Sequence, residues 1–132
     1  PDIKGRGTEI SDYAIDTTMP SVKSFIEKAP FTEFPFADGE FDFVIAIGAV
    51  YSLNLPDAIK CLKEIQRVGK GNSFITIGAY ETEEDLRLFR YWTLLGSTIL
   101  SKEDWVEVMN HAGYTGDYKF NTAQSLNLIE EK

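Results

Sequence analysis

Residues 48–53 form the segment in which chemistry is most expected. They follow an apolar run from Phe41 to Ile47 that only Asp42 interrupts. A run of this length that is rich in Val, Ile and Phe is typical of a strand buried on both faces of a parallel sheet. Ligands of such sheets bind beyond the carboxyl ends of the strands. The loop that begins at Gly48 is therefore expected to line a binding site.

Tyr51 is the candidate catalytic residue of this loop. A tyrosine hydroxyl can orient a substrate or accept its proton, but a phenol with a pKa of about 10 is a weak base near neutral pH. The other interpretation is therefore that Tyr51 lines the pocket without taking part in the chemistry. Gly48 and Ala49 are candidates for close approach of the backbone to a ligand, because a glycine leaves room there. The alternative for Gly48 is a simple turn.

Other reactive residue types point to structural roles. Cys61 is the single cysteine, so it forms no internal disulfide, and its place in a predicted helix favours a buried thiol over a nucleophile. A reducing cytoplasm is the expected compartment. His111, the single histidine, lies near the end of a predicted helix, where a cation is favourable. No grouping of Cys and His predicts a metal site, and no phosphate-binding or nucleophile-elbow motif is present.

Composition limits the partners that are expected. The chain has 132 residues, 21 acidic and 13 basic, with a net charge of −8. This length suits one domain or part of one. An acidic balance argues against nucleic acid as a partner, since such binding normally depends on clustered Lys and Arg. No apolar stretch reaches the length of a membrane span, so no membrane partner is expected.

The pattern of apolar and turn residues predicts alternating strands and helices. Strands are expected over residues 7–10, 23–29, 41–47, 72–79, 118–121 and 126–129, and helices over 12–18, 56–69, 82–93 and 101–113. This order implies an α/β sandwich with a mostly parallel sheet. The spacing of the last two strands suggests a C-terminal antiparallel hairpin.

Three stretches resemble class I S-adenosylmethionine-dependent methyltransferases. Pro-Phe-x-Asp-Gly-x-Phe-Asp-Phe-Val-Ile over residues 35–45 and Lys-Glu-Ile-x-Arg-Val over 63–68 look like the fourth strand and following helix of that family. Residues 7–14 resemble its second strand and helix. The resemblance implies a single Rossmann-like domain over residues 1–132. By the same resemblance the domain is expected to be N-terminally incomplete, because the family's first strand and Gly-rich loop would lie ahead of residue 1.

The resemblance also implies a function and its residues. The expected activity is methyl transfer from S-adenosylmethionine to a small-molecule acceptor. The family places an acidic residue like Glu9 on the ribose hydroxyls, with Ile10 and Phe31 beside the adenine. Pro30 stands where an acidic residue usually receives the adenine amino group, and proline offers neither a side-chain acceptor nor an N–H. A catalytically inactive module with an assembly or regulatory role is therefore the alternative, and an NAD-binding domain is a further one.

The family's sheet order places its first strand between the second and the fourth. The sequence leaves three ways to fill that place: residues upstream of Pro1, a strand from another chain as in a homo-oligomer, or direct pairing of the strands on either side. Buried unpaired backbone groups cost about 1–3 kcal/mol each, so the place is not expected to stay empty. The first way is favoured, because a natural domain would hardly start at its second strand.

An aromatic cover over the substrate is a further possibility, formed by Phe89, Tyr91 and Trp92 after the strand predicted at residues 72–79. These side chains could equally be buried in the core.

Overall fold

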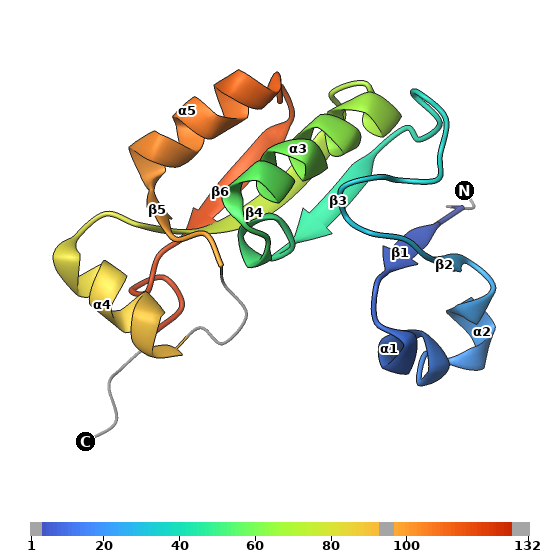
Figure 1. Ribbon diagram of the computed structural model, residues 1–132, viewed down its shortest axis with the longest axis horizontal. Coiled ribbons are helices and arrows are strands. Elements are labelled where there is room, and N and C mark those ends of the chain that lie inside the picture. The colour runs from blue at the N-terminus through green and yellow to red at the C-terminus, as the bar shows by residue number, and fades with distance from the viewer. Residues whose placement is uncertain (1–3, 93–96, 128–132) are drawn as a thin grey trace.

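The computed structural model describes residues 4–92 and 97–127 and shows an α/β arrangement (Figure 1). The elements are β1 (Gly7–Glu9), α1 (Asp12–Asp16), α2 (Pro20–Lys23), β2 (Ile26–Lys28), β3 (Val44–Ile47), the 3₁₀ turn Val50–Ser52, α3 (Leu55–Gly69), β4 (Ser73–Tyr80), α4 (Glu83–Trp92), β5 (Leu100–Ser101), α5 (Lys102–Ala112) and β6 (Asp117–Asn121).

Every strand pair in the described part of the chain is parallel. β4 lies between β3 and β6, and the short β5 pairs with the end of β4. β1 and β2 form a separate two-stranded sheet. The predicted α/β class with a mostly parallel sheet is therefore confirmed.

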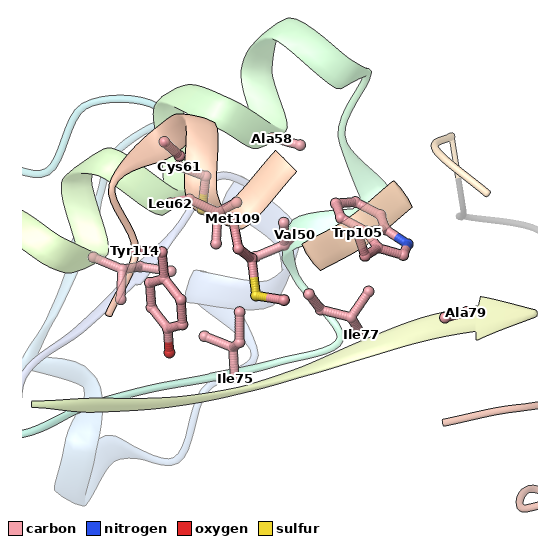
Figure 2. Close-up of a cluster of buried hydrophobic side chains, with 12 residues drawn as sticks. Val50, Ala58, Cys61, Leu62, Ile75, Ile77, Ala79, Trp105, Met109 and Tyr114 are labelled. Atoms are coloured by element: carbon pink, nitrogen blue, oxygen red, sulfur yellow. The ribbon is translucent and has the colours of Figure 1, made fainter. Parts of the chain in front are cut away.

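The core lies between the β3–β4–β6 sheet and the two helices α3 and α5 (Figure 2). Its largest fully buried side chains include Leu62 and Ile65 from α3, Ile75 and Ile77 from β4, and Trp105 from α5. Full burial of a side chain such as Leu62 or Ile75 is worth about 1.5–3 kcal/mol. This layer fixes the direction of β3 and β4, and with it the rim from which their loops leave.

Local signals define the ends of α3. The Asn54 side chain accepts a hydrogen bond from the Asp57 N–H at 2.9 Å, and Pro56 lies in the first turn. The helix ends at Gly69, and Lys70 follows in the left-handed region at a φ of 51°. The predicted helix over residues 56–69 is therefore confirmed with its boundaries nearly unchanged.

The structure differs from the sequence predictions at two strands. β3 is covered on one face only, since Ile45 and Ile47 are 66% and 64% exposed. No described helix covers the face of the sheet that these two side chains share. β6 forms where the first strand of the C-terminal hairpin is predicted, but it pairs with β4 and is parallel to it.

The direction of β6 follows from its connection. Helix α5 separates β5 from β6 and returns the chain to the end of the sheet where β4 starts, as a crossover helix does. Of the second predicted hairpin strand, Leu126 and Asn127 lie in a turn, and the rest falls outside the described residues.

The segment between β1 and β2 is more helical than predicted. The predicted strand over residues 23–29 shortens to Ile26–Lys28, because α2 occupies Pro20–Lys23. Pro20 suits the first position of a helix, where its missing N–H costs nothing.

Cys61 is buried in α3, as predicted, with 1% of its surface exposed. Burial raises the pKa of Cys61 to about 12, and the nearby Glu64 carboxylate adds to the shift. We therefore expect the native chain to show no reaction with Ellman's reagent at pH 8 over an hour, whereas the urea-unfolded chain reacts within minutes. Rapid labelling of the native chain would contradict this burial.

Candidate functional site

A cavity of about 300 Å³ lies between β1 and β3. Its lining is mostly apolar and comes from β1, β3, α3 and the connection between β2 and β3: Arg6, Gly7, Thr8, Phe31, Phe34, Phe36, Phe41, Phe43, Val44, Ile45, Ala46, Ile47, Ala49, Cys61, Ile65 and Val68. The arrows of β1 and β3 point the same way in Figure 1. The loops that follow the two strands therefore leave from the same side of the molecule.

Glu9 is the last residue of β1, and its carboxylate is held by the next turn. Its Oε1 accepts hydrogen bonds from the N–H groups of Ile10 at 2.9 Å and Ser11 at 3.1 Å. The Ser11 hydroxyl in turn accepts from the Ala14 N–H at 3.2 Å and caps α1. These two backbone N–H groups fix the carboxylate through Oε1, while none of the described groups donates a hydrogen bond to Oε2. Ile10 beside it is 56% exposed.

The loop after β3 turns sharply at Gly48. Its φ of +67° is one that residues with a β-carbon rarely adopt, and its N–H donates to Thr76 Oγ1 at 3.0 Å. Ile47 and Ala49 on either side both line the cavity. Gly48 therefore bends the chain at the mouth of the cavity without lining it.

Tyr51 lies in the 3₁₀ turn and does not line the cavity. Its ring packs over β4, since a β-carbon at Gly78 would lie 3.6 Å from it. Its carbonyl accepts the N–H groups of Ser97 at 3.0 Å and Thr98 at 3.1 Å. Tyr51 is therefore fixed both by the packing of its ring and by the hydrogen bonds to its carbonyl.

The connection from β2 to β3 forms an aromatic wall, which we define as the side chains Phe31, Phe34, Phe36, Phe41 and Phe43 that line the cavity. Phe36 and Phe41 stack edge to face with ring centroids 4.8 Å apart. Phe31 and Phe34 also pack against the core. The wall therefore links the cavity to the folded core.

Arg67 of α3 fixes the aromatic wall. Its guanidinium donates to the carbonyls of Phe36 at 2.7 Å and Phe34 at 3.1 Å, and it pairs with Asp38 at 2.8 Å and with Glu64. Glu64 Oε1 also accepts the Phe34 N–H at 2.9 Å. The hydrogen bond from Arg67, with that from the Phe34 N–H, holds the pKa of Glu64 below its usual value, and Glu64 raises the pKa of Arg67.

Sequence reasoning used the Glu64 and Arg67 pair only as a family signature and missed this role. The available signal was an acid and a base three residues apart on one helix. Their partners, however, lie about thirty residues away, in a segment with no regular structure.

The other predicted side chains are spread around this region. Of the six predicted site residues, Phe31 and Ala49 line the cavity, while Glu9, Ile10, Gly48 and Tyr51 do not. Phe89 is buried against Gly78, and Tyr91 is 52% exposed. The side chain of Trp92 lies outside the described part of the structure.

Within the described ranges, 4–92 and 97–127, no three or more His, Cys, Asp or Glu side chains are grouped so as to hold a metal ion. Each described helix is too short or too polar to cross a bilayer.

Comparison with known proteins identifies the family. The family model described as a methyltransferase domain matches residues 5–77, more than half of the chain. The chain belongs to the methyltransferase domain family. The matched part contains β1, β3, α3 and the aromatic wall, so the resemblance to class I methyltransferases is confirmed.

Among solved structures, the crystal structure of a Bacillus halodurans C-125 protein proposed to be a methyltransferase matches with a TM-score of 0.49 and 15% identity. The match covers 83% of this chain and 60% of that one. The chain thus spans about 60% of the length of that protein. No curated protein matches the sequence.

Proposed function

We propose that this domain takes part in methyl transfer from S-adenosylmethionine to a small-molecule acceptor, with the cofactor bound where β1 and β3 end. The observation that carries this proposal is the Glu9 carboxylate, which two backbone N–H groups hold at the end of β1. Membership of the methyltransferase domain family supports it.

The residues present fit the nucleoside part of this cofactor. A ribose offers two neighbouring hydroxyls, and a carboxylate whose Oε1 is already fixed can accept them through its remaining lone pairs. Ile10 is exposed beside Glu9, and Phe31 lines the cavity, so both suit the faces of an adenine. Gly48 and Ala49 would approach the methionine end.

S-adenosylmethionine supplies an activated methyl group on a positively charged sulfur. The protein's work in such a displacement is to position the acceptor and exclude water. Tyr51 is suited to positioning rather than to proton removal, because its ring and carbonyl are both held. Its hydroxyl would hydrogen-bond to the acceptor near Gly48.

Calorimetric titration with S-adenosylmethionine tests this function. Glu9→Gln is expected to weaken binding about 10- to 100-fold, because a hydrogen bond to a charged group contributes about 1.5–3 kcal/mol. Glu103→Gln in the first turn of α5 is the matched control and should leave the affinity unchanged. Absence of heat at millimolar ligand, or equal affinities of the two variants, would refute the assignment. NAD titrated in parallel should produce no heat.

A catalytically inactive, regulatory or assembly module is the second candidate. Pro30 favours it, because its carbonyl already accepts the Glu33 N–H at 3.3 Å and its ring offers no hydrogen bond to an adenine. If the domain is such a module, we expect it to bind no cofactor. Cytoplasm is the proposed compartment, supported by the single free thiol, and the net charge of −8 supports a partner other than nucleic acid.

A further inference from the structure

Strands β3 and β6 form the two borders of the larger sheet, and β4 lies between them (Figure 1). β6 pairs with β4 over Asp117–Asn121 and with no other strand in the described part of the chain. The border at β3 faces the cavity of the candidate site, whereas no residue of β6 lines that cavity. The outer edge of β6 is therefore a separate surface.

Strand β4 uses alternate residues for its two neighbours. The Val44 N–H of β3 donates to the carbonyl of Asn72, just ahead of β4, at 3.0 Å, so this carbonyl lies on the β3 side. In a parallel sheet, alternate residues bond to opposite neighbours. Ile75 and Ile77, which are three and five residues after Asn72, therefore bond toward β6.

This alternation decides which backbone groups of β6 point outward. Tyr118 lies opposite Ile75, and Phe120 lies opposite Ile77. A residue that bonds across a parallel pair does so to the residues on either side of its partner, so the partner itself points the other way. The N–H and C=O groups of Tyr118 and Phe120 therefore point away from β4, where no strand of the described ranges receives them. An edge of this kind is a template for pairing with another chain.

The described residues after β6 do not return along this edge. The Thr122 N–H donates to Ser125 Oγ at 2.8 Å, and the Leu126 N–H donates to the Thr122 carbonyl at 3.1 Å. The chain thus leaves β6 through a single helical turn. In a hairpin with β6, Leu126 would instead lie opposite the end of the strand.

The exposed side chains of β6 carry opposite charges two residues apart. Asp117 and Lys119 lie on one face of the strand, and both are exposed. Neither forms an ion pair with another residue that the structure describes. Tyr118 between them is 44% exposed, and its ring lies 5.2 Å from that of Phe120. The edge therefore has an acidic and a basic residue placed symmetrically about Tyr118.

We propose that β6 pairs antiparallel with the β6 strand of a second copy of this chain, with the two-fold axis at Tyr118. A two-fold interface sets the same surface of each copy against itself. With the axis at this residue, the outward N–H and C=O of Tyr118 bond to those of Tyr118 in the other copy. Asp117 of each copy then faces Lys119 of the other.

Charge complementarity selects both this register and this partner. Asp117 and Lys119 bond toward β4, so between two β6 strands they occupy the non-hydrogen-bonded positions, where facing Cα atoms are only about 4.5 Å apart. Two opposite-charge pairs at these positions stabilise the pairing. An axis at Lys119 would set two lysines directly opposite each other, which is destabilising. A second copy supplies both charges in the required order, whereas an unrelated strand has no reason to do so.

The pairing would join the two sheets into one that continues across the axis. A contact limited to two short strands is small, and small interfaces belong to weak, reversible complexes. We therefore expect the dimer to form at high protein concentration. The proposal does not depend on methyl transfer, because β6 takes no part in the cavity between β1 and β3.

Sedimentation velocity tests the proposal through a charge exchange. The sedimentation coefficient of the wild type should rise toward that of a dimer between about 10 and about 500 µM. Asp117→Lys and Lys119→Glu should each weaken dimerisation at least about tenfold, because two attractive pairs become repulsive. An equimolar mixture of these two variants should regain the dimer, since position 117 of each chain then faces an opposite charge at position 119 of the other.

Lys63→Glu is the matched control, because it makes the same change of charge at an exposed position of α3. It should dimerise as the wild type does. The proposal is overturned by a wild type that stays monomeric at about 500 µM, by a mixture that associates no better than its components, or by an equal loss in Lys63→Glu. The last result would show that net charge alone controls association.

Hydrogen exchange of the wild type gives a second readout that needs no variant. The Tyr118 and Phe120 amides should exchange at least about tenfold more slowly at the concentration where the dimer forms than in dilute solution, because they become bonded across the axis. The Lys119 amide, which faces β4, is the internal control. Protection of Tyr118 and Phe120 that is already complete in the dilute monomer would identify a segment of the same chain as the neighbour of β6 and refute the dimer.

Discussion

Replacing Trp105 by alanine is expected to lower the free energy of unfolding by about 3–5 kcal/mol, the range for truncating a large buried aromatic side chain. Trp105 has no exposed surface and lies in the core with Val50, Ile77 and Met109 (Figure 2). A typical domain is stable by only about 5–15 kcal/mol, so this loss is a large share of the total. Urea denaturation, monitored by far-ultraviolet circular dichroism, measures this loss of unfolding free energy.

Trp105→Phe separates packing from hydrogen bonding at the same position. The indole Nε1 is buried without a hydrogen-bond partner among the described residues, which costs about 1–3 kcal/mol. Phenylalanine removes this unpaired donor but leaves a small void. We therefore expect Trp105→Phe to lose less than half of what Trp105→Ala loses. Equal losses for the two variants would show that the indole N–H is satisfied in solution.

Features set by neighbouring residues could be predicted from the sequence. Helix α3 was located by its apolar spacing and by Gly69, and α5 by Ser101 and Gly113, which are its caps in the structure. Each of these signals lies within one helix or at its caps, so no knowledge of the rest of the fold is required.

Features set by distant segments could not be predicted. The apolar run of β3 indicates burial on both faces, but burial depends on what covers the far face, and Ile45 and Ile47 are exposed. The direction of β6 depends on the path of α5, not on the residues of the strand itself. The sequence of a strand shows which side chains share a face of the sheet. Whether that face is buried depends on the elements that pack against it.

The candidate site divides in the same way. The position of Gly48 at the end of β3 followed from strand-end logic, and its loop does border the cavity. The contact of Tyr51 with Gly78 and the hydrogen bonds from Arg67 to the aromatic wall join segments about thirty residues apart. No local pattern encodes such contacts, so the roles of Glu9, Ile10, Phe31 and Tyr51 stay predictions that binding experiments must test.

The second large effect is expected at Arg67. Arg67→Ala should lower the free energy of unfolding at pH 7 by about 2–4 kcal/mol, because hydrogen bonds to two carbonyls and two carboxylates are lost together. The estimate stays below the sum of these bonds, since the Arg67 side chain is 31% exposed and water replaces part of them. Glu64, only 15% exposed, would be left without its cation.

Arg87→Ala is the matched control for Arg67→Ala. Arg87 also pairs with a glutamate three residues before it on a helix, but both side chains of that pair are exposed, at 47% and 64%. Exposed pairs of this kind contribute little. A loss for Arg67→Ala no larger than that for Arg87→Ala would contradict the stabilisation that we assign to the contacts of Arg67 with the aromatic wall.

The pH dependence distinguishes the loss of the Glu64 ion pair from a general loss of packing. Glu64 has a lowered pKa in the folded chain, so its contribution is fully present above its unfolded value of about 4.3 and is lost as the pH falls through the folded value. The difference in stability between the wild type and Arg67→Ala should therefore be constant from about pH 7 to pH 5 and shrink below about pH 4. Urea midpoints measured at pH 7, 5 and 3.5 give this difference directly. A difference that stays constant down to pH 3.5 would show that Arg67 holds the wall through the Phe34 and Phe36 carbonyls alone, since these do not titrate.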